Sequence, residues 1–167
     1  VDNSEFNLFE AVNFLENAYK EIDSKTEIIP MLGSVCDENF MKEIFENFKI
    51  NNLFHAAAYK HVSIVEQNPI NGLRNNILST RISCKYAYKY KIDRFILISS
   101  DKAVRPTNIM GLSKRISELI VQSYDLLSKE NNNKSIFSLV RFGNVIGSSG
   151  SVIPLFLKQI ANGGPVL

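Results

Sequence analysis

Residues 94–99, with the sequence RFILIS, are the stretch that decides the fold. Their central residues are all apolar and do not alternate with polar ones, which is typical of a strand buried inside a parallel sheet. The segment from Thr107 to Leu127 follows, and its apolar residues recur at helical spacing. A buried strand followed by a long amphipathic helix predicts one βαβ unit.

The same alternation of strand and helix continues on both sides of this unit. Further strands are expected at Thr26–Leu32, Leu53–Ala58 and Ile136–Phe142, and helices at Ser4–Tyr19, at Asp37–Phe48, within His61–Tyr90 and at Ile153–Ala161. Ser4 and Asp37 can cap the first two helices, and Pro69 fits the first position of the third. We therefore predict an α/β fold with about four complete parallel strands in a doubly wound sheet, entered at the tip of an earlier strand that ends near Asp2.

Composition narrows the classes of protein. With 167 residues, 45% of them hydrophobic, the chain has the length and apolar content of one domain. Its 19 basic and 17 acidic residues are scattered, so no nucleic-acid partner is expected. It lacks a signal peptide and a run long enough to span a bilayer, so the chain itself is expected to be soluble. It begins without Met and stops at a turn, so we interpret it as a fragment.

Two cysteines and one run of small residues have simple interpretations. Cys36 and Cys84 lack the spacing of a metal site, which predicts free thiols in a reducing compartment and no metal. Ala56, Ala57 and Ala58 follow a predicted strand, where small side chains would let a ligand lie against the backbone. Tight packing explains the alanines equally well.

The most informative residues follow the strand at 94–99. Ser100, Asp101 and Lys102 place a hydroxyl, a carboxylate and an amine at one strand tip. Met110 and Lys114 lie one helical turn apart, so one helix face can present both to a ligand. A capped surface turn is the alternative interpretation of the first three residues.

Three ordered blocks resemble a known family. They are AAAYKHV at 56–62, SSDKAVRPTNIMGLSKR at 99–115 and VRFGNVIGSSGSVIPLF at 140–156. Together they resemble the extended short-chain dehydrogenase/reductase superfamily, which has a Rossmann-like fold. Within it they are most similar to the polysaccharide-biosynthesis branch that makes 4-keto-6-deoxy sugars from UDP-N-acetylglucosamine. The likeness runs from Asp2 to the last residue.

The resemblance implies an NAD-dependent 4,6-dehydratase with a UDP-sugar as substrate; NADP is the second choice of cofactor. The family carries a Tyr-x-x-x-Lys pair where this chain has Met110 and Lys114, and the lysine holds the nicotinamide ribose. Methionine cannot take a proton. It is typical of the long, membrane-anchored, C5-retaining subgroup, which would place the chain in a cytoplasmic domain of an inner-membrane protein.

The resemblance also implies roles at the strand tip. Asp101 would be the acid that protonates the departing 6-hydroxyl, which requires a raised pKa. Lys102 would take the C5 proton, which requires a lowered pKa. Their mutual attraction opposes both shifts, so a neutral pair is the useful state. Ser100 would hydrogen-bond the sugar 4-hydroxyl and stand in for the missing tyrosine.

Other residues match the family's binding positions. Asp2 would bind the adenosine ribose and Asp37 the adenine; the alternatives are a solvated terminus for the first and a helix cap for the second. Asn144 and Ser151 would contact substrate, the latter in a flexible glycine-serine loop. Asn76 lies either near the active site or on a solvated helix face. Lys60 and His61 are further substrate-binding candidates, with a structural role for the histidine as the alternative.

The domain prediction follows from the same likeness. Residues 1–167 would form a partial NAD-binding domain, with the substrate-binding part starting at 143. The first glycine is Gly33, so the first strand and the Gly-rich phosphate loop are lacking, and weak or no cofactor binding is expected of the chain alone. A homodimer is implied by the resemblance. A same-fold epimerase or reductase, or a non-catalytic cofactor-binding domain, remain alternatives.

Overall fold

The computed structural model describes residues 1–22, 25–143, 145 and 152–165. Its elements, in chain order, are α1 (Glu5–Glu21), α2 (Glu38–Asn47), β1 (Asn52–His55), α3 (Val62–Gln67), α4 (Pro69–Lys89), β2 (Arg94–Ser100), the short 3₁₀ helix η1 (Asp101–Ala103), α5 (Ile109–Glu130), β3 (Ile136–Phe142) and α6 (Val152–Ala161). Strands and helices therefore alternate through the body of the chain.

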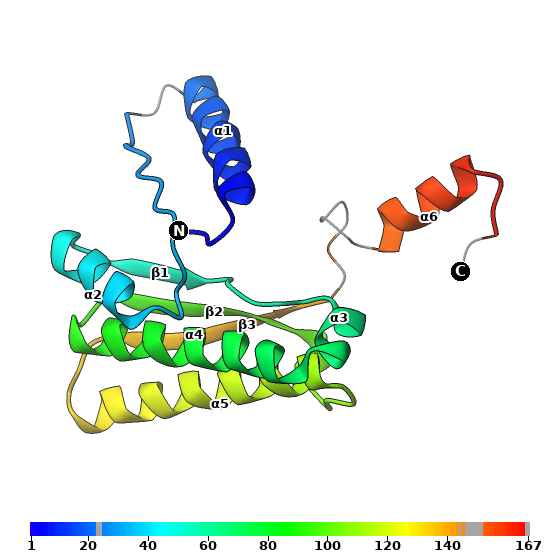
Figure 1. Ribbon diagram of the computed structural model, residues 1–167. Helices are drawn as coiled ribbons and strands as arrows, with labels where there is room; N and C mark the ends of the chain where they lie inside the picture. Colours follow the sequence, from blue (N-terminus) through cyan, green and yellow to red (C-terminus); the bar gives the residue numbers. More distant parts are fainter. Residues whose placement is uncertain (23–24, 144, 146–151, 166–167) are drawn as a thin grey trace.

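The three named strands form one parallel sheet in the order β1-β2-β3. The register pairs Leu53 with Phe95 and Phe95 with Phe137, so the apolar residues of the three strands stand side by side. The long helices α4 and α5 run next to each other along one face of the sheet (Figure 1). This arrangement confirms the predicted Rossmann-like α/β fold.

The core lies between this face of the sheet and the helices. Phe95 and Leu97 of β2 are fully buried, and the ring of Phe95 lies 5.5 Å from that of Phe137. Burying a side chain of this size contributes about 1.5–3 kcal/mol. Along β2 the residues alternate between buried and half-buried, with Ile96 and Ile98 half-buried. β2 is thus the buried central strand that its composition predicts, with one face fully buried and the other half-buried.

The strand expected at Thr26–Leu32 does not form as a strand. The segment makes one isolated parallel bridge, between Asp2 and Leu32, with hydrogen bonds of 3.2 Å from Asp2 N to Met31 O and 2.9 Å from Gly33 N to Asp2 O. Pro30 has no N–H to donate, which limits a continuous ladder there. The sheet of the described residues thus has three strands instead of about four.

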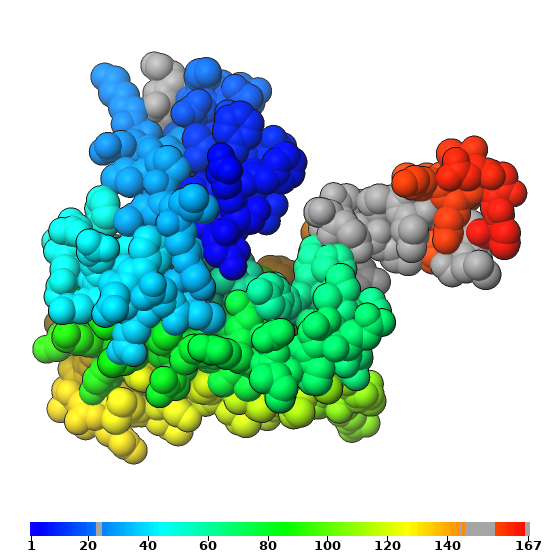
Figure 2. Space-filling view, in the orientation of Figure 1, coloured from blue at the N-terminus to red at the C-terminus, as the bar shows by residue number. Residues whose placement is uncertain are grey.

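The helix ends agree well with the sequence. Ser4 Oγ accepts a hydrogen bond from Asn7 N at 3.3 Å, and Asp37 caps α2 through Asn39 N and Phe40 N. Pro69 occupies the first turn of α4. Helix α1 and the segment that follows it stand off the main body (Figure 2), and none of the residues of α1 is buried.

Candidate active site

The end of β2 gathers the three polar residues that the sequence singled out. Asp101 Oδ1 accepts hydrogen bonds from Ser100 Oγ at 2.9 Å and from the backbone N of Lys102 at 2.9 Å. The Lys102 Nζ lies 3.2 Å from the same oxygen. Both charged side chains remain accessible, with exposed fractions of 55% for Asp101 and 39% for Lys102. One carboxylate oxygen thus receives three donors at the open tip of the strand.

The ionisation of Asp101 differs from the expected one. The hydrogen bond from Ser100, followed by that from Lys102, lowers the pKa of the Asp101 carboxyl below its ordinary value. Donors and a nearby cation stabilise the charged form, and the exposed side chain loses little hydration. The expectation of a raised pKa is therefore wrong for this arrangement, in which Asp101 is an ionised partner of Lys102.

The Ser100–Lys102 turn packs on the N-terminal end of helix α5. The helix begins after Asn108, whose side-chain oxygen accepts a hydrogen bond from Gly111 N at 2.7 Å, while Glu66 Oε1 accepts one from Ile109 N at 2.5 Å. A Cβ atom on Gly111 would lie 2.5 Å from the carbonyl oxygen of Lys102. Only glycine permits this approach. The backbone of Lys102 therefore packs directly on the first turn of α5.

Met110 and Lys114 share the buried face of α5, as their spacing predicts. Their exposed fractions are 3% and 8%. The ammonium group of Lys114 donates a hydrogen bond of 2.9 Å to the carbonyl oxygen of Ile98, two residues before Ser100. Burial lowers the pKa of Lys114 to about 8, and the charge of Glu118 opposes that shift. Lys114 thus lies beneath the tip of β2 with a reduced preference for the charged form.

Asn76 of α4 is a positioning residue for the loop after β1. It is 1% exposed, so the solvated-face alternative is wrong. Its side-chain oxygen accepts a hydrogen bond from Tyr59 N at 2.8 Å, and its Nδ2 donates to Tyr59 O at 3.1 Å and to Ser113 Oγ at 2.8 Å. The loop is therefore tied to both α4 and α5.

The other candidates of this loop are accessible. Strand β1 ends at His55, so the three alanines lie beyond it; Ala56 and Ala57 are exposed and Ala58 is half-buried. Lys60 and His61 are exposed as well. In a parallel sheet the carboxyl ends of all strands lie at the same end of the sheet. This loop therefore lies at the same end as Ser100.

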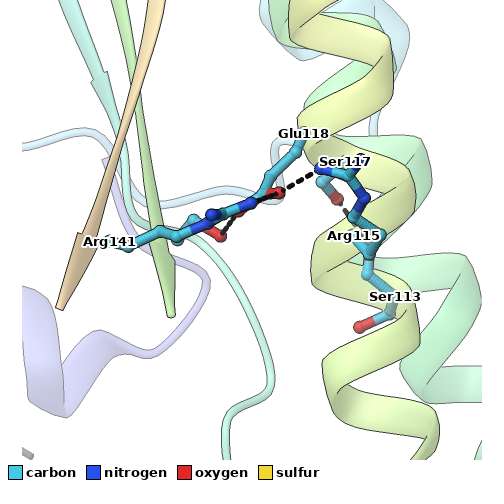
Figure 3. Close-up of polar contacts among 6 residues, drawn as sticks. Ser113, Arg115, Ser117, Glu118 and Arg141 are labelled. Atoms are coloured by element: carbon cyan, nitrogen blue, oxygen red, sulfur yellow. Dashed lines mark hydrogen bonds and ion pairs between the residues drawn. The ribbon is translucent and has the colours of Figure 1, made fainter. Parts of the chain in front are cut away.

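A buried carboxylate that the sequence analysis missed lies next to this site (Figure 3). Glu118 of α5 has an exposed fraction of 0%. Its Oε1 accepts hydrogen bonds from Ser99 Oγ at 2.6 Å and Arg141 Nε at 2.8 Å. Its Oε2 accepts from Arg141 at 2.6 Å and from Arg115 at 3.0 Å. The signal was its spacing, four residues after Lys114 on the same helix face.

The ionisation of Glu118 follows from these donors. Burial raises its pKa, but the hydrogen bonds from Arg141, Ser99 and Arg115 outweigh it and lower the pKa to about 2. Glu118 is thus an anion at neutral pH, although it has no contact with solvent.

A separate cleft of about 450 Å³ lies between the segment after Asp2 and the start of α4. Its lining includes Asn3, Ser34, Cys36, Tyr59, Arg74 and Asn75, and excludes the Ser100–Lys102 turn. Asp2 and Asp37 each adjoin a lining residue in sequence. The Asp2 carboxylate accepts a hydrogen bond of 2.8 Å from Ser4 N, and that of Asp37 caps α2.

The remaining observations concern the cysteines, two substrate candidates, and membrane and metal features. Cys36 and Cys84 are free thiols, as expected. Asn144 and Ser151 lie outside the described residues. Within the described ranges, no helix combines the length and the apolar composition needed to cross a bilayer. In that same part of the chain, His, Cys, Asp and Glu side chains form no group suited to a metal ion.

These features define a class of protein: a Rossmann-like domain whose strand ends carry accessible polar groups. The family model described as "Polysaccharide biosynthesis protein" matches residues 1–167. The chain therefore belongs to the polysaccharide biosynthesis protein family.

Individual relatives agree with this assignment. The "Capsular polysaccharide biosynthesis protein CapD" of Staphylococcus aureus is 45% identical over 147 residues, covering 88% of this chain and 24% of the relative. A "UDP-N-acetylglucosamine 4,6-dehydratase (inverting)" of Campylobacter jejuni is 35% identical over 136 residues, covering 81% of this chain and 40% of the relative. UDP-glucose 4-epimerases of Rickettsia species also match, that of Rickettsia canadensis at 38% identity over 68% of this chain and 33% of its own.

A solved structure shares the fold over nearly the whole chain. The X-ray structure of Pen from Bacillus thuringiensis superposes with a TM-score of 0.78 at 34% identity, covering 96% of this chain and 46% of that one. The chain spans about a quarter of the length of the first curated relatives that it matches, 24% and 26%.

Proposed function

We propose that the chain is the catalytic core of an NAD-dependent nucleotide-sugar 4,6-dehydratase that converts UDP-N-acetylglucosamine to its 4-keto-6-deoxy product. The observation that carries the proposal is the Ser100–Lys102 turn at the tip of β2, where a carboxylate and an amine lie 3.2 Å apart. A dehydratase needs an acid and a base on one substrate, and this pair supplies both. The relative from Campylobacter jejuni supports the substrate.

A proton transfer within the Asp101–Lys102 pair can give the protonation states that the elimination needs. Asp101 is ionised in the open site, and the acid role needs it protonated. Because Lys102 Nζ already bonds Asp101 Oδ1, one proton transfer between them gives a neutral acid and a neutral amine. A sugar that covers the turn would displace water, which favours the neutral pair over the charged one.

From the neutral pair the reaction balances. Lys102 takes the C5 proton while Asp101 gives its proton to the departing 6-hydroxyl, so one water leaves and the pair returns to its charged form. Lys102 then returns a proton to C5. Ser100 hydrogen-bonds the sugar 4-hydroxyl, whose proton leaves to solvent through Ser100 Oγ as C4 is oxidised. After Lys102 has returned its proton to C5, one proton from solvent restores its ammonium form, so the net loss is one water. The chemistry that NAD supplies, when bound, is the uptake of a hydride from C4 and its return to C6.

The described residues fit NAD in two places. Lys114, whose ammonium lies under the tip of β2, would hold the nicotinamide ribose, next to Met110. Asp2 and Asp37, each next in sequence to a residue that lines the 450 Å³ cleft, would bind the adenosine, and Ala56 to Ala58 would lie against the cofactor. A carboxylate at Asp2 repels a ribose phosphate, which favours NAD over NADP. The Gly-rich phosphate loop is not among residues 1–167.

Other parts of the proposal rest on the resemblance. Substrate binding by Lys60, His61, Asn144 and Ser151, anchoring to the inner membrane with this domain on the cytoplasmic side, and pairing into a homodimer remain predictions. Exposed leucines on α5 support the pairing; they are Leu112, Leu119 and Leu126.

Mass spectrometry tests the function. The full-length natural protein that contains residues 1–167 would be incubated with NAD and UDP-N-acetylglucosamine. A product lighter by one water is expected. An unchanged mass with inverted stereochemistry at C4 would instead establish an epimerase, the second candidate, which the similarity to the Rickettsia epimerases favours. No change in a folded, NAD-binding protein would exclude both reactions on this substrate.

A further inference from the structure

The carboxylate of Glu118 joins three parts of the molecule at one point. Ser99 belongs to β2 and directly precedes Ser100, Arg141 belongs to β3, and Glu118 itself lies one turn beyond Lys114 on α5. Both oxygens are occupied: one by Ser99 and Arg141, the other by Arg141 and Arg115. A buried charge costs free energy unless it is fully bonded, and an apolar side chain would fill the same space without that cost. The packing of the core therefore does not explain why a glutamate stands here.

From this geometry we propose that Glu118 is a positioning residue, which fixes the tip of β2 with Ser100, Asp101 and Lys102 relative to Lys114 on α5. The role in turnover rests on the proposed dehydratase function; the mechanical link does not. Two successive residues of β2 bond to α5: Ile98 O accepts a hydrogen bond from Lys114, and Ser99 Oγ donates one to Glu118. The strand tip is therefore held to α5 at two points. A displacement of about 1 Å at such a site can lower a rate by about a hundredfold.

Glu118 also acts on Lys114 through its charge. It raises the pKa of Lys114 against the effect of burial. His55 of β1 interacts electrostatically with Lys114 but is neutral near pH 7, because burial lowers its pKa to about 3. Removing the charge of Glu118 should therefore lower the pKa of Lys114 further below 8.

Several charged groups on the elements packed against Lys114 are already bonded to other groups. Arg141 of β3 and Arg115 of α5 bond Glu118 itself, Asp101 and Lys102 of η1 bond each other, and Glu66 of α3 bonds Ile109 N. From α4, the groups nearest this face are the uncharged Asn76 and Ser79. Among the described residues, Glu118 is thus the anion whose charge raises the pKa of Lys114.

The decisive experiment compares Glu118→Gln with Arg115→Gln in the natural protein. The glutamine side chain keeps the shape of the glutamate but can serve only part of the donors, so kcat should fall about 10–100-fold while KM for UDP-N-acetylglucosamine changes less than about threefold. The alkaline limb of the pH–rate profile should move to lower pH. Arg115→Gln removes one donor from the same carboxylate without releasing either strand, so its kcat should stay within about twofold.

A second readout does not depend on turnover. NMR titration of ¹³Cε-labelled lysines, with the Lys114 signal identified by its loss in Lys114→Arg, should show a lower pKa in Glu118→Gln and no decrease in Arg115→Gln. If the wild type makes no dehydrated sugar, the proposed function fails while this titration still decides the role of Glu118. Should Glu118→Gln not fold, Ser99→Ala releases only the β2 contact and should lower kcat by a smaller factor. Wild-type kcat per folded molecule with an unshifted Lys114 titration would overturn the proposal.

Discussion

The Ser100–Lys102 turn and the Glu118 cluster, which is Glu118 with Ser99, Arg115 and Arg141, both lie at the end of β2 but differ in exposure and in how they are assembled. The turn is exposed, and its ion pair is formed by neighbours in sequence. In the second group the Glu118 carboxylate is buried, while the two arginines that bond it are 37% exposed, and its partners come from two strands and a helix. An exposed pair contributes little to stability, whereas a buried charge is strongly destabilising unless it is fully bonded. The two proposals therefore give catalysis to the exposed turn and positioning to the buried carboxylate.

The largest expected effect breaks the chemistry and leaves the fold intact. Asp101→Asn and Lys102→Ala should each lower kcat by about 10²–10⁴-fold, since each removes a proton-transfer group. Both side chains are accessible, so the thermal midpoint should change little. Asp125→Asn, which disrupts another Asp–Lys pair on α5, is the matched control and should leave kcat unchanged. Steady-state kinetics and thermal unfolding check both statements; an active Asp101→Asn variant would refute the acid role.

The next effect acts on the contact between the two regions. Gly111→Ala places a Cβ 2.5 Å from the carbonyl oxygen of Lys102, so the turn must move away from α5. The clash outweighs the better helix propensity of alanine, and we expect a net loss of about 1–2 kcal/mol together with a lower kcat. Gly143→Ala, whose new Cβ would have no atom of the described residues within 4 Å, should change stability by less than about 0.5 kcal/mol. Urea unfolding of the two variants makes the comparison.

A smaller effect should have the opposite sign. Burial lowers the pKa of Lys114 to about 8, so the protonated form costs folding free energy at neutral pH. Lys114→Met should therefore raise the free energy of unfolding by roughly 1–2 kcal/mol while weakening NAD binding. Lys85→Met, at an exposed ion pair with Glu38, should give no such gain. Calorimetry of NAD binding and denaturant unfolding test the two halves separately, and a destabilised Lys114→Met would contradict the first.

The smallest expected effect is on the pH dependence of the free energy of unfolding. His55 is buried, and its pKa of about 3 lies below the ordinary value of 6.5. The unfolded chain binds this proton first, so stability should fall as the pH drops below about 6.5, by at most about 1.4 kcal/mol per pH unit. His55→Gln should flatten this slope. Glu118 contributes only at lower pH, because its stabilisation is lost as the pH falls toward about 2. Unfolding measured between pH 5 and 7 therefore isolates His55.

The sequence was sufficient where local chemistry decides the structure. Ser4 and Asp37 cap the helices that follow them with their own side chains, Pro69 fits the first turn of α4, and β3 has the predicted bounds. It was insufficient where a distant partner decides. The segment at 26–32 has strand-like composition, but a ladder needs a neighbour, and Pro30 lacks one donor. The spacing of Glu118 showed which face it shares with Lys114 and could not show the arginine of β3 that holds its charge.

Asn76 gives the loop after β1 an unusual kind of order. Its amide satisfies both the N–H and the C=O of Tyr59, the two groups that a neighbouring strand would otherwise satisfy. One side chain thus serves as a one-residue strand partner. The conformational entropy of this loop is lost when the chain folds instead of when a ligand binds. The loop that carries Ala56 to Ala58 is therefore preorganised, and a ligand that binds there would not have to order it, which raises its affinity.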